Sequence, residues 1–285
     1  MRKISVRSLA ACISMLVMAG SPVVAEELTA AQIVEKNVAA RGGLDAWKNI
    51  QSMVWVGHIE RGSASTTSLP FVLEMKRPNK TRFEIKAQNQ TAVRAYDGNQ
   101  GWKQRMANGN KPELQPYTNE ELRFAADAQG IDGPLVDYQA KGIAVALGGI
   151  DEIEGRKAYR LKVRFPSGAS RNIWIDAQSF LDVKYDREFR NGPGQSGTMS
   201  VFYRNYQKIG DLQIPLVIEN GTNTVQIIDR MVIDRVLLNP PLSDVVFAKP
   251  SLPGRSNTIA VESPRQVAGP ARILRPRSFS GREAQ

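Results

Sequence analysis

The stretch RKAYRLKVRF, residues 156–165, decides the fold class of this chain. Its apolar side chains occupy every second position from Tyr159 to Phe165, and arginine or lysine fills the positions between them. Successive side chains of a β-strand point to opposite faces of a sheet. The alternation therefore predicts a strand with one apolar face and one wet face.

The same period of two recurs on both sides of this stretch. Short runs rich in β-branched and aromatic residues, such as FVLEMK and TRFEIK, lie between residues 52 and 104 and again between residues 143 and 238. Clusters such as RPNK and DGNQ separate the runs and are typical of turns. The sequence predicts eleven or twelve short antiparallel strands, because strands and helices do not alternate as a parallel sheet requires.

Three segments interrupt the strand pattern. Residues 29–50 show helical spacing of apolar residues, and the pair Gly42 and Gly43 divides them into two helices. Residues 118–129 predict a further helix, with Thr118 as its cap and Glu121 three residues later. Residues 134–140 are interpreted as a short helix or an ordered loop.

The two ends of the chain differ in composition from the part between them. Residues 1–25 combine basic residues, a short apolar run and a small-residue exit, which predicts a secretory signal; an uncleaved anchor is the alternative. Residues 26–250 form the predicted folded domain, and residues 251–285, rich in Pro, Ser and Arg, are predicted to be disordered. The single cysteine, Cys12, lies within the predicted signal, so the mature domain has no disulfides.

The net charge excludes one class of partner. The whole chain carries a formal charge of +10, but residues 1–25 contribute +3 and residues 251–285 contribute +4. The folded domain therefore carries only +3. A domain this close to neutral lacks the electrostatic footprint of a nucleic-acid-binding protein, and we expect no nucleic-acid partner.

The usual catalytic and metal-binding motifs are missing or misplaced. His58 is the only histidine, so a zinc site or a Ser-His-acid triad is not expected, and His58 is interpreted as a solvent-facing strand residue. The string GPGQSG, residues 192–197, lies between two predicted strands and not before a helix. We expect neither an enzyme nor a cofactor or metal ion; a hydrolase that uses paired carboxylates is the weakest alternative.

The predicted strands carry an unusually continuous set of apolar side chains. These could line one inner face and, if the few helices only plug a curved sheet, a ligand cavity. The predicted lining consists of Trp55, Phe71, Leu73, Met75, Phe83, Ile85, Tyr159, Leu161, Val163, Ile173 and Ile175. The alternative is that the helices and the sheet close into an ordinary dry core.

Several phrases, in their order along residues 30–250, resemble the LolA/LolB-like family of periplasmic lipoprotein carriers, or the wider group of outer-membrane lipoprotein-sorting-like proteins. They include GGLDAWKNIQSM (42–53), FVLEMKRPNKTRFEI (71–85), AYDGNQGW (95–102), RNIWIDAQSFLDVKYD (171–186), NYQKIGDLQIPLVIE (205–219) and NPPLSDVVFAKP (239–250). The resemblance implies a mainly β fold: an unclosed antiparallel β-barrel of about eleven strands with a helical lid and an apolar cavity. It also implies a lid-gating arginine, for which Arg82 and Arg94 are candidates.

Two hypotheses for function follow. In the first, the chain is a periplasmic carrier or binding protein of a Gram-negative bacterium, soluble after signal cleavage and monomeric. Its partners would be lipid or lipoprotein acyl chains, and components of the inner or outer membrane. In the second, it is a cell-envelope interaction module with a fully packed core and no ligand, whose basic tail, residues 251–285, docks on anionic lipid.

Overall fold

A computed structural model describes residues 27–62, 68–88, 90–105, 113–128, 130–192, 195–222 and 227–250. The predicted signal and the predicted disordered tail lie outside these residues. The helices of the described part are α1 (Ala30–Ala40), α2 (Leu44–Lys48), α3 (Asn119–Asp127) and the short 3-10 helix η1 (Asp244–Val246). None of them is long and apolar enough to cross a membrane.

The strands of the first part of the described chain are β1 (Ser52–Arg61), β2 (Ser68–Lys76), β3 (Lys80–Ala87), β4 (Gln90–Tyr96), β5 (Gly101–Gln104) and β6 (Leu114–Pro116). After α3 follow β7 (Ala144–Ile153), β8 (Arg156–Arg164), β9 (Ser170–Asp176), β10 (Asp182–Gly192), β11 (Gln195–Ile209), β12 (Leu212–Thr222) and β13 (Ile227–Leu238).

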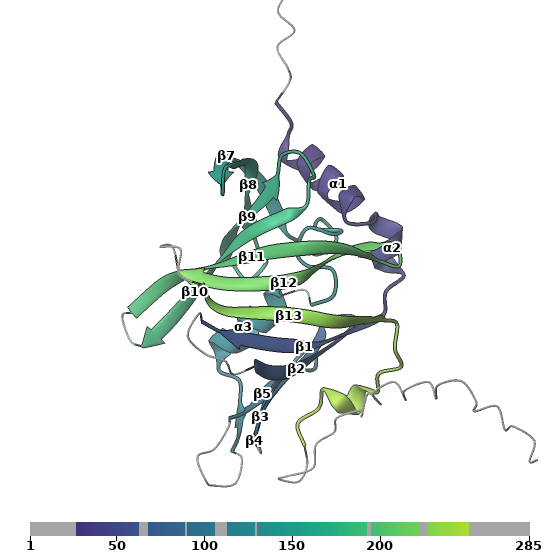
Figure 1. Cartoon of the computed structure of the whole chain (residues 1–285), viewed down its shortest axis with the longest axis vertical. Helices are drawn as coiled ribbons and strands as arrows, with labels where there is room; N and C mark the ends of the chain where they lie inside the picture. The colour runs from purple at the N-terminus through teal and green to yellow at the C-terminus, as the bar shows by residue number, and fades with distance from the viewer. Residues whose placement is uncertain are drawn as a thin grey trace, which may run out of the picture.

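All strands join one antiparallel sheet in the order β6-β5-β4-β3-β2-β1-β13-β12-β11-β10-β9-β8-β7. Neighbouring strands in the sheet are consecutive in the chain, with one exception. Strands β1 and β13 pair with each other and bring the two ends of the sheet's sequence together. Within the described residues no pairing joins the edges β6 and β7, so the sheet is curved but unclosed (Figure 1). The predicted mainly β, unclosed architecture is confirmed.

The strand count differs slightly from the prediction. The described residues contain thirteen strands, and the one that the sequence pattern missed is β6. This strand has three residues and ends with Pro116 at the edge of the sheet. Three residues are too few to show an alternation, and proline is tolerated only where an edge strand needs no further hydrogen bond.

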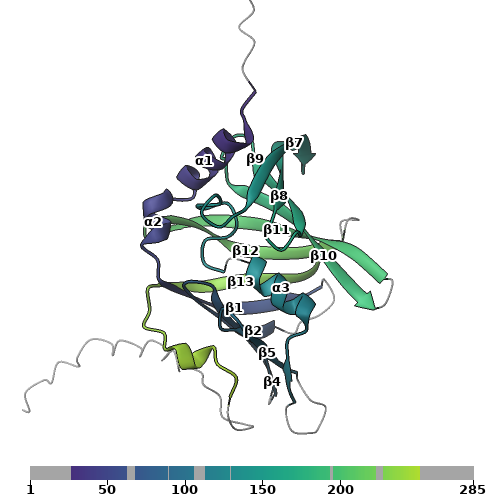
Figure 2. The same ribbon diagram turned by 180° about the vertical axis from the view of Figure 1, so that it is seen from behind.

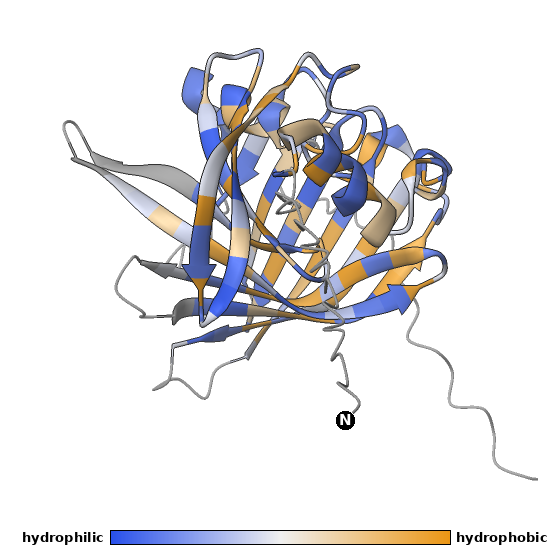
Figure 3. Cartoon of the chain, turned by 90° about the horizontal axis from the view of Figure 1, so that it is seen from above, coloured by the Kyte–Doolittle hydropathy of each residue, from blue (hydrophilic) through white to orange (hydrophobic). Residues whose placement is uncertain are grey.

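Helices α1, α2 and α3 and the loop of residues 130–142 lie on the inner, concave face of the sheet (Figure 2). Bands of hydrophobic residues cross the strands on that side (Figure 3). On the outer face, the segment with η1 covers β1, β2 and β5: Val246 and Phe247 pack against Val54, and the Trp102 indole donates a hydrogen bond of 2.9 Å to the Phe247 carbonyl. The outer face therefore has a small core of its own.

Candidate functional site

The strand pairing places all eleven predicted lining residues on the inner face. On β1–β3, Trp55 pairs with Leu73 and Leu73 with Phe83. On β8 and β9, Leu161 pairs with Ile173. Directly paired residues point to the same side of a sheet. What covers these side chains differs from one end of the sheet to the other.

At the β8–β9 end the inner face is packed solid. The space above Leu161 and Ile175 is filled by Ile33 and Val34 of α1 and by Leu135 of the loop of residues 130–142. Both strand side chains are 0% exposed. The same cluster contains Val163 and Ile173, and Tyr159 packs against its rim and stacks on Phe180 at a centroid distance of 6.0 Å.

At the β2–β4 end the inner face borders open space. A hollow of about 800 Å³ lies between these strands and α3, and we call it the acyl hollow, a name that anticipates the ligand proposed for it. Its lining is Leu73, Met75, Thr81, Phe83, Arg94, Lys103, Tyr117, Thr118, Glu120, Glu121, Phe124, Ala125, Ala128 and Gly130. Leu73 and Phe83 remain partly accessible, in contrast to Leu161 and Ile175. Apolar strand side chains form its floor.

The composition of α3 explains why the acyl hollow is not filled. Over its nine residues, NEELRFAAD, the helix buries only Asp127. Ala125, and Ala128 just beyond the helix, line the hollow with single methyl groups. By contrast, α1 buries Ile33 and Val34. A side chain that is too short for the gap leaves its neighbours without contact atoms.

Polar contacts hold α3 at a fixed place above β4 and β5. Glu121 accepts hydrogen bonds from Lys103 Nζ at 2.8 Å and from Arg94 Nη2 at 2.9 Å. Its carboxylate also accepts from the Thr118 amide, and the Thr118 hydroxyl accepts from the Glu121 amide, so the predicted capping box is present. Burial alone would raise the pKa of Glu121, but these hydrogen bonds outweigh burial and lower that pKa to about 2.

Two further contacts fix the other sides of α3. Asn79, in the turn between β2 and β3, donates to the Ala126 carbonyl at 2.9 Å. On the opposite side, the Ser167 hydroxyl, in the β8–β9 turn, donates to Asp127 at 2.7 Å. Helix α3 thus spans the open side of the curved sheet, from β4 to the β8–β9 turn.

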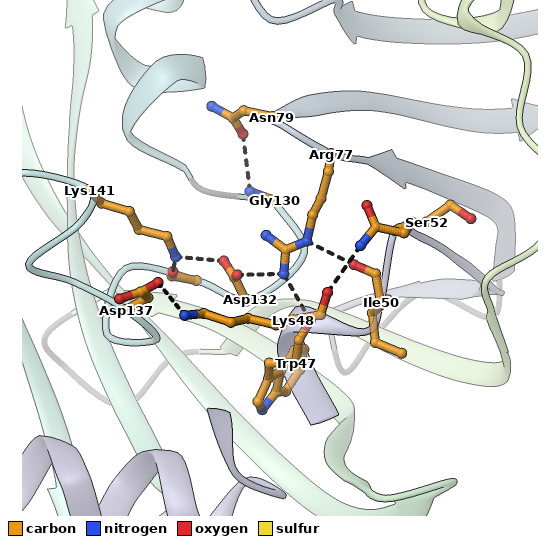
Figure 4. A network of polar contacts seen from close by, with 12 residues as sticks. Trp47, Lys48, Ile50, Ser52, Arg77, Asn79, Gly130, Asp132, Asp137 and Lys141 are labelled. Carbon is orange, nitrogen blue, oxygen red and sulfur yellow. Dashed lines mark hydrogen bonds and ion pairs between the residues drawn. The ribbon is translucent and has the colours of Figure 1, made fainter. Parts of the chain in front are cut away.

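The loop of residues 130–142 is anchored by a charged network (Figure 4). Asp132, 4% exposed, accepts from Arg77 Nη2 at 2.7 Å and from Lys141 Nζ at 2.6 Å. Arg77 also donates to the carbonyls of Ile50 and Trp47. Burial lowers the pKa of Lys141, and the Asp132 carboxylate opposes that shift. The network joins the loop to α2 and to the end of β2.

A smaller cavity continues from the acyl hollow toward the middle of the sheet. It measures about 260 Å³, and we call it the tyrosine chamber. Its lining includes Tyr185, Tyr203, Tyr206, Arg41, Arg171, Asp182, Trp47, Trp55 and Ile173. Phe124, Ala128 and Gly130 line both spaces, so the two adjoin at the end of α3. Burial raises the pKa of Tyr203 and of Tyr206 well above the usual value for a tyrosine.

The predicted lining residues thus fall into four groups. Leu73, Met75 and Phe83 line the acyl hollow, and Trp55 and Ile173 line the tyrosine chamber. Tyr159, Leu161, Val163 and Ile175 belong to the packed cluster under α1. Phe71 and Ile85 lie at the far end of β2 and β3, where Phe71 contacts Phe83 at a centroid distance of 5.6 Å. That any of them binds a ligand stays a prediction.

The two candidate arginines lie on opposite faces. Arg82 is buried on the outer face, where it pairs with Glu74 at 3.0 Å and with Glu84. Arg94 lies on the inner face, lines the acyl hollow, and stands over the Tyr117 ring at 5.0 Å. Of these two arginines, only Arg94 can contact both α3 and a molecule in the hollow.

Sequence reasoning missed most of the tyrosine chamber. The chamber residues Arg41, Tyr203 and Phe124 come from three separate elements. None of them belongs to the alternating apolar positions from which the cavity lining was predicted. The nearest sequence signal was the cluster of Tyr185, Tyr203 and Tyr206 along two neighbouring strands. Among the described residues, no three His, Cys, Asp or Glu side chains gather closely enough to hold a metal ion.

Comparison with known proteins gives structural likeness only. No protein-family model and no curated protein matches the sequence. A DUF1329 family protein from Desulfovibrio piger is similar in structure, with a TM-score of 0.50 and 11% identity over 77% of this chain and 97% of that chain. A LolA superfamily protein from Nitrosomonas europaea has a TM-score of 0.49 and 14% identity over 78% of this chain and 99% of that chain.

This chain shares the fold of the DUF1329 family protein, and its own strands form an unclosed antiparallel β-sheet. The unclosed, mainly β architecture that the resemblance implied is thereby confirmed at the level of the fold. Identities this low carry no information about ligand or partner. The features of this chain that bear on its function are the acyl hollow and the tyrosine chamber.

Proposed function

We propose that this protein is a periplasmic carrier or binding protein that holds an acyl chain of a lipid or lipoprotein in the acyl hollow. One observation carries the proposal: Leu73 and Phe83, two adjacent apolar side chains on the inner face, border open space under α3. An acyl chain placed there would leave water and would cover these side chains. Each buried CH₂ group contributes about 0.8 kcal/mol.

The size of the two spaces fits this role. The acyl hollow of about 800 Å³ and the tyrosine chamber of about 260 Å³ adjoin at Phe124. Ligand sites usually occupy roughly 300–1,000 Å³ and combine apolar walls with a few polar groups. Met75 on the floor can adapt its flexible side chain to different chains.

Helix α3 would act as the lid of the hollow, and Arg94 as the residue that senses its closure. Arg94 contacts Glu121 of α3 while it also lines the hollow. A chain that enters beside Phe83 would pass this contact, because Phe83 pairs directly with Arg94 across β3 and β4. The lid-gating role implied by the resemblance therefore falls to Arg94 and not to Arg82.

The test is binding of a fluorescent fatty acid to the purified mature protein and to two tryptophan variants. Ala125 lines the acyl hollow, whereas its neighbour Ala126 is exposed. Ala125→Trp should fill the hollow and weaken binding at least about tenfold, and Ala126→Trp should bind like the wild type. Organic extraction of gently purified protein should also release lipid. Equal binding by both variants, or none by the wild type, would refute the proposal.

The envelope-module hypothesis has support from the other end of the sheet. In the cluster under α1, Leu161 and Ile175 are fully buried and therefore closed to a ligand. A protein without bound lipid and without fatty-acid binding, yet retained on envelope fractions, would fit this alternative. Loss of that retention on deletion of residues 251–285 would assign it to the basic tail.

A further inference from the structure

The tyrosine chamber contains a buried arginine whose hydrogen-bonding capacity is mostly unused. The Arg41 side chain is only 13% exposed, and its single ion pair in the described residues joins Nε to Asp182 Oδ2 at 3.5 Å. Its terminal nitrogens, Nη1 and Nη2, donate no hydrogen bond to any described residue. A guanidinium has five N–H donors, so most of those of Arg41 remain available to a molecule in the chamber that its side chain lines.

The backbone around Arg41 holds this side chain in place. Arg41 caps the C-terminal end of α1, and its carbonyl accepts a hydrogen bond of 3.0 Å from the Gln213 amide of β12. Gly42 follows with φ +119°, and a Cβ there would come within 2.3 Å of the Asp211 carbonyl. The guanidinium lies over the Trp47 ring at 4.6 Å. Arg41 is thus positioned before any ligand arrives.

A tyrosine in the same chamber packs its ring against Tyr185 but has no hydrogen-bond partner for its hydroxyl in the described part of the chain. The Tyr203 hydroxyl makes no hydrogen bond to a described residue, and the half-buried side chain lines the chamber. Tyr206, by contrast, donates to the Asp182 carbonyl at 3.0 Å. A hydroxyl beside an open cavity that has no hydrogen-bond partner in the protein can donate to a polar group that enters the cavity.

The charges that face the chamber favour an anion. Arg41 and Arg171 contribute two positive charges, and Asp182 contributes one negative charge. The Asp182 carboxylate also accepts from Asn37 Nδ2 at 3.3 Å, so its charge is partly satisfied within the protein. Arg171 stands over the rings of Phe124 and Phe165 at 4.8 Å, which places its charge at the passage to the acyl hollow.

We propose that the tyrosine chamber binds the anionic head group, a carboxylate or a phosphate, of the acyl ligand, and that Arg41 makes the principal contact. The chain would run past Phe124 into the acyl hollow, and the Tyr203 hydroxyl would donate to the same head group. The inference rests on the proposed function, and it adds the class of ligand: a single-chain lipid with a negative charge at one end. Arginine suits this role because its fork matches both oxyanions.

The test compares ligands that share one chain and differ in the head group. Dissociation constants for dodecanoate, dodecyl phosphate and dodecanol are measured by calorimetry on the mature protein. The anionic ligands should bind about tenfold or more tightly than the alcohol. Arg41→Met, which keeps an apolar stem over Trp47, should reduce this ratio to about threefold or less. Arg164→Met, on the exposed outer side of β8, is the matched control and should leave the ratio unchanged.

Tyr203→Phe provides a second test if Arg41→Met fails to fold, because it removes one oxygen and keeps the ring. It should reduce the preference for the anion by about threefold to tenfold. Equal binding of dodecanoate and dodecanol by the wild type would overturn this inference and leave the proposed function standing. Absence of binding by all three would instead overturn the proposed function. Binding of acetate or inorganic phosphate as tight as that of dodecanoate would indicate a site for free anions and would also refute the inference.

Discussion

On β8 and β9 the inner face lies against α1, and on β2 and β3 it faces α3. Both ends of the sheet carry apolar side chains at every second position, and strand pairing puts them on one side. Under α1, the side chains of Leu161, Val163 and Ile175 pack in one cluster with Ile33 and Val34 and are fully buried. Under α3 the strand side chains meet alanines and open space. The comparison teaches that the covering helix, and not the strand pattern, decides whether an apolar face becomes core or cavity.

The largest expected effect is on the free energy of unfolding, and it compares one substitution at each end of the sheet. Leu161→Ala should lower the free energy of unfolding by about 2–5 kcal/mol, because it opens a cavity in a packed cluster. Leu73→Ala should cost clearly less, about 1–2 kcal/mol, since Leu73 already borders a hollow. Urea denaturation followed by tryptophan fluorescence measures both. Equal losses would show that the two ends are packed alike.

The next effect concerns the loop of residues 130–142, which reaches both ends of the sheet. Asp132→Asn removes the charge that pairs with Arg77 and Lys141, and it should cost about 2–3 kcal/mol. Asp137→Asn is the control, because its pair with Lys48 is exposed and worth less than about 0.5 kcal/mol. Thermal unfolding of both variants measures these two losses of stability. A silent Asp132→Asn would mean that the loop is held by its apolar contacts alone.

A smaller effect should appear at α3 only. The pKa of Glu121 is lowered to about 2, so its contribution is present above the unfolded value near 4.5 and is lost as the pH falls from 4.5 to 2. Because the carboxylate is partly solvated, we expect Glu121 to contribute about 1 kcal/mol to the free energy of unfolding. Glu121→Gln should reduce the hydrogen-exchange protection of α3 at pH 7 and leave α1 unchanged. Glu35→Gln, at an exposed position on α1, should change neither helix.

The smallest effect lies on the outer face, away from both ends of the comparison. A hydrogen bond that His58 Nδ1 donates to Asp234 Oδ2, 3.0 Å away, raises the pKa of His58 against the effect of burial, and Glu60 raises it further. A raised pKa gives stability that is present below the unfolded value near 6.5 and is lost as the pH rises through the folded value. His58→Gln should remove this pH dependence, worth less than about 1 kcal/mol. Unfolding curves between pH 5 and 8 measure it.

Much of the fold could be predicted from residue order alone. The alternation from Tyr159 to Phe165 placed β8 and its two faces correctly, and the caps Thr29 and Thr118 marked the starts of α1 and α3. These features depend on neighbours within a few residues of one another. The string GPGQSG, predicted to lie between two strands, begins at the last residue of β10, Gly192, and continues into β11 from Gln195. Only β6, with three residues, was missed.

The site was harder to predict because it depends on distant segments. Leu73 and Leu161 are equivalent in the strand pattern, yet only Leu73 borders the hollow. The difference arises from Ala125 in one helix and Ile33 in another, which strand periodicity does not encode. Arg41 and Tyr203 meet in one chamber although 162 positions separate them in the chain. No local motif signals such a meeting.

Photo-crosslinking with a diazirine fatty acid tests the central claim most directly. The mature protein is irradiated with the bound probe, digested, and the labelled residues are mapped by mass spectrometry. We predict labels on Leu73, Phe83 and Phe124, and none on Leu161 or Ile175. Labels on β8, β9 and α1, or no labelling that an excess of unlabelled fatty acid can suppress, would contradict the account.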